Sequence, residues 1–298
     1  MTEFSLLEIV RVNNILGECI LWDEREQGIW WTDIHGSRLY RYTLASGALR
    51  EFTVPGRLCS FGFVEGDERL ICAFAEGIAL HQPGTQKLEW LFEPERGSKG
   101  TRFNDGRVDR QGRFWTGTMV ESEPALDAAG KPLRGSLYWI SRAGHGKAFG
   151  DIGIPNSLCW NRAGTRMYFA DSPRGNIVAH DFDAASGAVG EGRVFASAPK
   201  GCAPDGSIVD AEDCLWNAQW GGGKVLRYAP DGKLLTTLEL PVSQPTCQCF
   251  GGPGLDLLIV SSARENLDAA QLRAQPEAGN VFIYRTPYVG LPESRYRL

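Results

Sequence analysis

The sequence lacks several features that would place it in the commoner functional classes. No window approaches eighteen consecutive apolar residues, so no segment is expected to cross a membrane as a helix. Residues 1–5 lack the basic-then-apolar pattern of a secretory leader, and we therefore expect a cytoplasmic protein. The net charge is -5, without the basic excess of a nucleic-acid surface, so neither nucleic acid nor membrane is an expected partner.

Familiar catalytic motifs are also scarce. There is no Gly-x-Ser-x-Gly sequence, so a serine hydrolase of the nucleophile-elbow type is not indicated. The four histidines show no metal-ligand spacing. The eight cysteines are scattered and several fall inside apolar strand patterns, which favours free buried thiols over disulfides.

Helical periodicity is nearly absent, and in its place a strand–turn–strand pattern recurs six times. The six turns are Glu26-Gln27-Gly28, Glu65-Gly66-Asp67, Arg110-Gln111-Gly112, Arg162-Ala163-Gly164, Ala211-Glu212-Asp213 and Gly252-Pro253-Gly254. Each turn lies between short β-rich runs, as in a hairpin. A third run follows each time, and a fourth follows in five of the units. The one expected helix covers residues 267–274, with Asn266 as its cap.

Six repeats of roughly 40–55 residues, each with four strands, are typical of a β-propeller. The sixth unit lacks a fourth strand, and the isolated β-rich run at residues 6–12 can supply it and close the ring. We therefore expect an all-β, six-bladed β-propeller with four antiparallel strands per blade, closed by the N-terminal strand. No linker divides the chain, so residues 1–298 are expected to form a single domain. A large β-sandwich is the alternative.

Four oxygen-bearing side chains occupy equivalent places in this repeat. Glu18, Asn104, Asn156 and Asp205 each lie eight positions ahead of a hairpin turn. In a ring of blades, equivalent positions meet around one axis. Two carboxylates and an amide oxygen, from Glu18, Asn156 and Asp205, suit a hard cation such as calcium, magnesium or manganese. Few protein ligands leave coordination positions open, so such a cation can polarise a carbonyl or acidify a water.

Strand alternation predicts which loops share a face with these residues. The links into the first strand and between the second and third strands of a blade lie on one side. The longer loops belong to this group: residues 92–104, 119–135, 197–205 and 262–279. Arg102 enters from the same side and can hold a substrate hydroxyl or carboxylate by paired hydrogen bonds. Asp105, Asp171 and Asp210 are expected to be structural.

An ordered set of short motifs resembles one known family. The motifs are Leu16-Gly17-Glu18, Arg102-Phe103-Asn104-Asp105-Gly106, Gly117-Thr118-Met119, Pro155-Asn156-Ser157 and Pro204-Asp205-Gly206. Together they resemble the gluconolactonase/regucalcin family, also called senescence marker protein or luciferin-regenerating enzyme. The tail, with Gly251-Gly252-Pro253 and Ser262-Ala263-Arg264, is similar to the bacterial sugar-lactonase branch.

The resemblance implies a propeller that holds one divalent cation through Glu18, Asn156 and Asp205. The cation would be calcium, zinc, magnesium, manganese or iron(II). It also implies that Arg102 and Asn104 contact the substrate, together with an acid near Glu121, in a loop whose sequence differs from the family pattern.

The implied reaction is hydrolysis of a sugar (aldono) lactone to the aldonic acid in sugar catabolism. Asp205 would act as base toward water and then as acid toward the ring oxygen, unless a water activated by the cation takes the role of base. Two other functions stay open, namely a metal-dependent phosphotriester or aryl-ester hydrolase and a non-enzymatic calcium-binding propeller. The partner would be a small sugar lactone, and the sequence does not indicate an oligomeric state.

Overall fold

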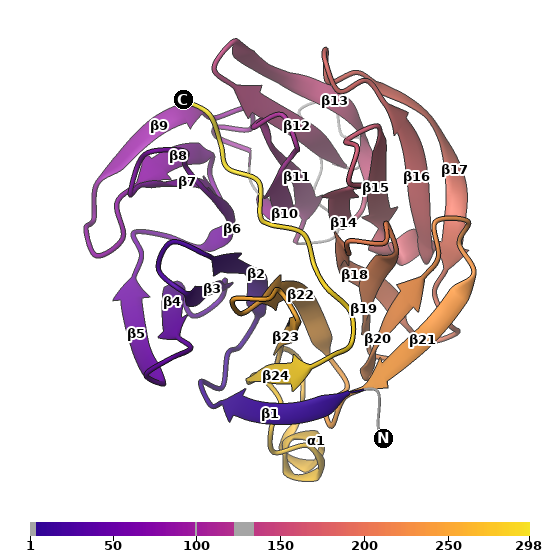
Figure 1. Ribbon diagram of the computed structural model, residues 1–298. Helices are drawn as coiled ribbons and strands as arrows, with labels where there is room; N and C mark the ends of the chain where they lie inside the picture. The colour runs from indigo at the N-terminus through magenta and orange to yellow at the C-terminus, as the bar shows by residue number, and fades with distance from the viewer. Residues whose placement is uncertain (1–3, 99, 122–133) are drawn as a thin grey trace.

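A computed structural model describes residues 4–98, 100–121 and 134–298, and Figure 1 shows their arrangement. Six four-stranded antiparallel sheets surround one axis, which confirms the six-bladed propeller. Blade 1 comprises β2 (Gly17–Asp23), β3 (Gly28–Asp33), β4 (Arg38–Thr43) and β5 (Ala48–Thr53). Blade 2 comprises β6 (Leu58–Phe63), β7 (Leu70–Phe74), β8 (Ile78–His81) and β9 (Leu88–Phe92). Blade 3 comprises β10 (Thr101–Val108), β11 (Phe114–Val120), β12 (Gly135–Ser141) and β13 (Gly144–Ile152).

The second half of the ring repeats this order. Blade 4 comprises β14 (Pro155–Trp160), β15 (Arg166–Asp171), β16 (Asn176–Phe182) and β17 (Val189–Ser197). Blade 5 comprises β18 (Ala203–Val209), β19 (Leu215–Trp220), β20 (Lys224–Tyr228) and β21 (Leu234–Glu239). Blade 6 comprises β22 (Pro245–Gly251), β23 (Leu257–Ser262), β24 (Val281–Arg285) and β1 (Ser5–Val10). Because β1 pairs antiparallel with β24, the N-terminal strand completes the last blade, as predicted.

The one predicted helix lies where the sequence placed it, but the residue predicted as its N-cap was wrong. Helix α1 spans Ala269–Ala274, and Asp268 caps it by accepting hydrogen bonds from the backbone N–H groups of Ala270 and Gln271. Asn266 has a left-handed backbone, with φ of 58°, whereas an N-cap residue is normally extended. A short 3-10 helix, η1 (Ser172–Arg174), was not anticipated and follows β15.

The innermost strand of every blade carries an irregularity at the same place. The register shifts lie between Glu18 and Leu21, Leu58 and Ser60, Phe103 and Gly106, Asn156 and Cys159, Pro204 and Ser207, and Pro245 and Gln248. A bulge re-aims the side chain beside it and is common next to functional sites. In blades 1, 3, 4 and 5 a residue at this bulge, Glu18, Asn104, Asn156 or Asp205, lines a cavity at one end of the channel.

Large aromatic side chains fill the spaces between and within the blades. Four tryptophans are fully buried: Trp22, Trp31, Trp115 and Trp216. Trp22 and Trp31 belong to one apolar cluster, and Trp115 and Trp216 each belong to another. All eight cysteines are free thiols, seven of them buried, in line with the sequence-based expectation.

In the part of the chain that the structure describes, no helix is long and apolar enough to cross a membrane.

Equivalent aspartates stabilise the hairpin turns of blades 3 and 5, and one of them is Asp210, which the sequence predicted to be structural. Asp210 accepts hydrogen bonds from the backbone N–H groups of Glu212 and Cys214, from Trp216 Nε1 and from Arg227 Nε. Asp109 makes the equivalent bonds to its own turn and to Trp115. Asp210 therefore fastens a turn to the core, as the sequence predicted.

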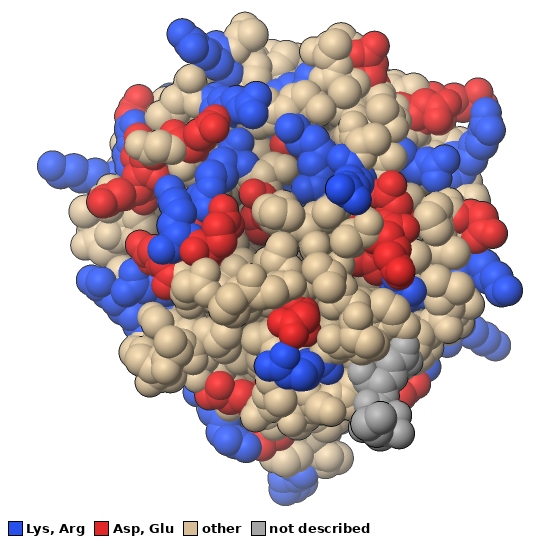
Figure 2. Space-filling model, in the orientation of Figure 1, with Lys and Arg blue, Asp and Glu red and all other residues tan. Residues whose placement is uncertain are grey.

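The chain ends in a segment that crosses the centre of the ring, visible as the yellow trace in Figure 1. We call residues 286–298 the C-terminal strap. Backbone bridges join it to blades 5 and 2, Asp210 with Gly290 and Val64 with Tyr296. Both bridges lie beyond the far ends of the inner strands. The strap therefore covers one end of the channel, and basic and acidic side chains interleave on that face without a single-sign patch (Figure 2).

Candidate active site

A cavity of about 260 Å³ opens at the other end of the channel, near the starts of the inner strands. Its size lies near the lower limit for small-molecule pockets. Thirteen residues line it: Leu16, Glu18, Arg102, Asn104, Met119, Ile154, Asn156, Ser172, Ala203, Asp205, Trp220, Glu265 and Asn266. Five of the six residues predicted from the sequence as ligands or substrate contacts therefore share one pocket. The sixth, Glu121, is not among the lining residues.

The local backbone explains why the candidate ligands face this cavity. Cys19 and Ser157, which directly follow Glu18 and Asn156, have left-handed backbones with φ of 46° and 62°. Such a conformation is costly for a residue with a side chain and persists only where neighbouring structure enforces it. At both positions it coincides with the bulge of the inner strand. The strained backbone at Cys19 and Ser157 is therefore part of the local structure that directs the Glu18 and Asn156 side chains into the cavity.

Two buried aspartates hold the segments that lead into these ligands. Asp33 accepts hydrogen bonds from the N–H groups of Ile15 and Leu16, at 2.9 and 3.0 Å. Asp171 does the same for Gly153 and Ile154, at 3.0 and 2.9 Å. In both blades the bonded pair ends two residues before the candidate ligand. Asp171 is therefore a structural anchor, as the sequence suggested, and Asp33 is its counterpart in blade 1.

Two of the three carboxylates that line the cavity, Glu18 and Asp205, have raised pKa values. Burial, followed by the charge of Asp105, raises the pKa of Glu18 to about 8. Burial, then the charges of Glu18 and Asp105, raises the pKa of Asp205 well above its usual range. Among the described residues, Asp205 Oδ1 is buried without a hydrogen-bond partner. A buried carboxylate oxygen without a partner, in the same cavity as a second carboxylate, is an arrangement that a cation would complete.

The amides beside these carboxylates are fixed by one another. Asn104 Nδ2 donates to Asn156 Oδ1 at 3.1 Å and to the Pro155 carbonyl at 3.0 Å. Asn156 Nδ2 donates to Ser172 Oγ at 2.9 Å, which leaves Asn156 Oδ1 as its acceptor in the cavity. Asn104 therefore orients Asn156, so the structure gives it a supporting contact that the sequence had not indicated.

Arg102 lies beside this pair and is itself strongly held. It is only 5% exposed, and its Nη1 donates to Asn104 Oδ1 at 2.7 Å while its Nε donates to Glu121 Oε1 at 2.9 Å. Glu121 also accepts both Nη groups of Arg57, at 2.6 and 2.9 Å. Arg57 and the charge of Arg102 lower the pKa of Glu121 against the effect of its burial. Glu121 therefore neutralises and positions Arg102 from outside the cavity.

A second acidic group, Asp210, Glu212 and Cys214, also brings possible metal ligands within 4.8 Å of one another. Its carboxylates are already occupied, because Arg227 bonds to both Asp210 and Glu212. This group lies at the strap end of the channel, away from the cavity. The Glu18–Asn156–Asp205 set, which includes an amide, fits an oxygen-preferring cation better.

Several lining residues were not singled out from the sequence, although their loops were. Trp220 belongs to Gln219-Trp220-Gly221-Gly222, which strand alternation also assigns to this mouth, and Glu265 belongs to the long loop at residues 262–279. Glu265 is bonded to His35 Nε2 at 2.8 Å, across 230 positions of sequence. No local pattern could have indicated that pair, because its two members meet only when the ring closes.

Comparison with known proteins agrees with the propeller fold and with the motifs of the sequence. Residues 16–264 match the family model described as SMP-30/Gluconolactonase/LRE-like region. The chain is 35% identical to 6-deoxy-6-sulfogluconolactonase of Pseudomonas putida, over 96% of each protein. It is 34% identical to L-arabinolactonase of Azospirillum brasilense, over 95% of this chain and 92% of that protein. A solved structure from Agrobacterium tumefaciens, described as the calcium-binding protein regucalcin, superposes with a TM-score of 0.90 at 33% identity, over 98% of each chain. The chain therefore belongs to the SMP-30/gluconolactonase/LRE-like family, as its motifs suggested.

Proposed function

We propose that this protein is a metal-dependent lactonase that opens sugar lactones to aldonic acids in sugar catabolism. By class it is a hydrolase acting on a carboxylic ester, as are the lactonases among its relatives. The observation that carries the proposal is the buried Asp205, whose Oδ1 lacks a partner among the described residues while its carboxylate shares a small cavity with Glu18. Folding alone gives no reason to bury a carboxylate oxygen without a partner beside a second carboxylate, whereas cation binding and proton transfer do.

Glu18, Asn156 and Asp205 are the residues that would hold the cation. Asn104 and Ser172 fix the amide of Asn156, so the donor set is oriented before any ligand enters. A divalent cation bound there supplies stabilisation of the negative charge that develops on the lactone carbonyl oxygen. The identity of the cation is not determined by an all-oxygen donor set.

Asp205 is positioned to move the protons of the reaction. Water attacks the carbonyl carbon, and Asp205 removes one proton from that water as the new C–O bond forms. The bond from the carbonyl carbon to the ring oxygen then breaks, and Asp205 returns the proton to that oxygen. The products are the alcohol and the carboxylic acid of one open chain, so no co-reactant besides water is needed.

Arg102 and Asn104 would orient the lactone above these groups. The guanidinium is fixed on two sides by Asn104 and Glu121, which limits its conformational freedom. A pre-oriented donor loses little entropy when it binds a ligand. We assign Glu121 a positioning role through Arg102, in place of direct substrate contact.

The test is an activity panel on chelator-treated protein. We expect hydrolysis of neutral aldonolactones, measured as acid release, to disappear after chelation and to return when one divalent cation is restored. Aryl esters and phosphotriesters serve as the comparison substrates. Faster turnover of either ester class would replace the lactone assignment, and cation binding without any turnover would support a calcium-binding propeller instead.

The raised pKa of Glu18 predicts how stability depends on pH without a cation. Because its folded-state pKa is about 8 and its ordinary value is 4.5, the stabilising protonated form is lost as the pH rises through this interval. We therefore expect the Tm of the chelated protein to fall between those pH values. A saturating cation should raise Tm by about 4 °C at a hundredfold excess over Kd, and more so at the alkaline end. A Tm that is unchanged by every cation would contradict the assignment of Glu18 as a ligand.

A further inference from the structure

One part of the cavity lining has chemistry beyond that of the candidate ligands. It combines one aromatic side chain, Trp220 at the end of β19, with one carboxylate, Glu265 in the loop between β23 and α1. Neither residue belongs to the proposed donor set of the cation or takes part in the proton transfers described above. Both line the same cavity as Asp205.

Glu265 is held in place by contacts from two blades. His35, in the β3–β4 loop of blade 1, bonds to Glu265 Oε1 through Nε2 at 2.8 Å. Gln244 Nε2 donates to the backbone carbonyl of Glu265 at 3.1 Å. The N–H of the preceding residue, Arg264, donates to the Ile15 carbonyl at 3.0 Å. The carboxylate is thus fixed by the seam at which the propeller closes.

One oxygen of this carboxylate is left for a ligand. His35 occupies Oε1, and no hydrogen bond from a described residue reaches Oε2. The side chains of Glu265 and His35 are 28% and 26% exposed, which places the pair at the cavity rim with access to solvent. A free carboxylate oxygen accepts hydrogen bonds from hydroxyl groups and repels anions.

Trp220 offers the apolar surface that a sugar ring requires. It pairs across the strands with Ala203, two positions before Asp205, so the indole stands next to the segment that carries the proposed base. Its partial burial against the core leaves part of the ring on the cavity. Aromatic faces pack well against flat apolar surfaces, such as the C–H face of a sugar.

The basic side chains described in the cavity lining do not neutralise the charge of Glu265. Arg102, the one arginine that the structure places in the cavity lining, is committed to Asn104 and Glu121. A bound cation would compensate Glu18 and Asp205, but the rim would keep the charge of Glu265. The described part of the pocket therefore favours a ligand tail that carries hydroxyls and no negative charge.

We propose that Glu265, held by His35, and Trp220 form a subsite for the hydroxyl-bearing end of an uncharged sugar lactone, and that Glu265 discriminates against lactones with an anionic tail. The inference rests on the proposed lactonase function. It names the substrate class, neutral aldonolactones, and the residues that select it.

The experiment compares kcat and KM for gluconolactone and for the same lactone carrying a sulfonate at carbon 6. Assays run on cation-loaded protein at about pH 8, above the ordinary pKa of an imidazole. We expect the wild type to prefer the neutral lactone by at least tenfold in kcat/KM. Glu265→Gln should reduce this preference about tenfold, chiefly by lowering KM for the sulfonated lactone. Trp220→Ala should raise KM for both lactones alike.

A matched control separates this effect from surface charge in general. Glu277 lies in the same connection between β23 and β24, is 25% exposed and pairs with Arg11 outside the cavity, so Glu277→Gln should leave the preference unchanged. An unchanged preference in Glu265→Gln, or a wild type that prefers the sulfonated lactone, would overturn the subsite while leaving the lactonase function intact. Failure of the wild type to hydrolyse any lactone would overturn both.

Discussion

Asp205→Asn is expected to lower kcat for lactone hydrolysis by about a thousandfold, in line with the loss of a general acid–base group. The same change should leave the cation-free protein at least as stable as the wild type. The reason is that the Asp205 carboxylate is buried beside Glu18 and Asp105, and its Oδ1 has no partner among the described residues. An asparagine keeps the shape and one oxygen and removes an unfavourable charge. Steady-state kinetics and thermal unfolding of the chelated protein measure the two effects.

Asp210→Asn is the matched control. Asp210 lies five positions further along the same segment and is also fully buried, but its two oxygens accept four hydrogen bonds. We expect this variant to lose stability and to keep the kcat of its folded fraction. If Asp205→Asn retained wild-type turnover, or if Asp210→Asn were the variant that lost it, the assignment of Asp205 as proton carrier would fail.

The contrast between these aspartates shows what the sequence can reveal. Asn104, Asn156 and Asp205 were found because a repeated fold places matched residues at matched offsets from a turn. The offset is local, and rotation about the propeller axis converts it into proximity. The same reasoning placed the long loops at one mouth. Chain-local rules therefore predicted the architecture and five of the residues that line the pocket.

What the sequence did not indicate depends on contacts between distant parts of the chain. Glu121 was expected to contact the substrate; it pairs with Arg57, just before β6, and with Arg102, and it is not among the described residues that line the cavity. His35 and Glu265 meet only at the closing seam. The helix cap was misassigned by two residues because Asn266 and Asp268 are equally good caps by type, and only the backbone of Asn266 excludes it.

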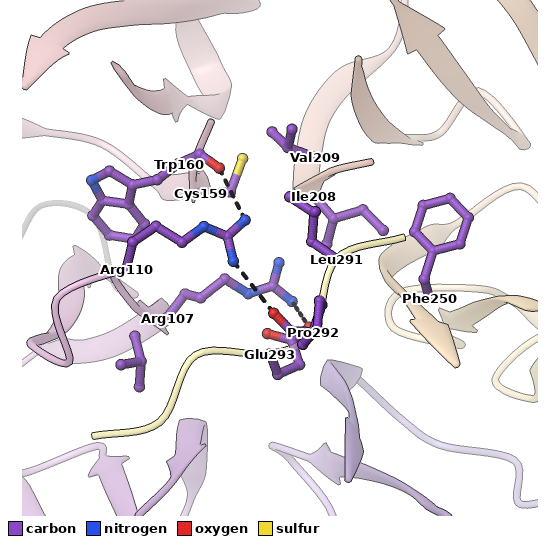
Figure 3. A pocket seen from close by; sticks show the side chains of 11 residues that line it. Arg107, Arg110, Cys159, Trp160, Ile208, Val209, Phe250, Leu291, Pro292 and Glu293 are labelled. Atoms are coloured by element: carbon purple, nitrogen blue, oxygen red, sulfur yellow. Dashed lines mark hydrogen bonds and ion pairs between the residues drawn. The ribbon is translucent and has the colours of Figure 1, made fainter. Parts of the chain in front are cut away.

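The largest effect on stability is expected from the C-terminal strap, whose Glu293 enters the channel from the end opposite the cavity. There it pairs with Arg107 of β10, and Arg110 bonds to the Pro292 carbonyl beside it (Figure 3). The Arg107 and Glu293 side chains are only 11% and 14% exposed. Glu293→Ala should therefore lower the free energy of unfolding by about 3 kcal/mol, because it leaves a buried guanidinium short of a partner. For a chain of this length that corresponds to a fall in Tm of about 5 °C.

A second ion pair of the strap provides the comparison. Arg297 and Glu65 are 62% and 59% exposed, so Arg297→Ala should cost less than about 1 kcal/mol, and added salt should erase the difference. Equal Tm values for the two variants would show that the strap does not depend on its buried pair. Below its Tm, Glu293→Ala should keep the kcat of the wild type, since the cavity lies at the other end of the channel. Asp205→Asn and Glu293→Ala would then have opposite effects on stability, because Asp205 Oδ1 has no hydrogen-bond partner among the described residues whereas Glu293 pairs with Arg107.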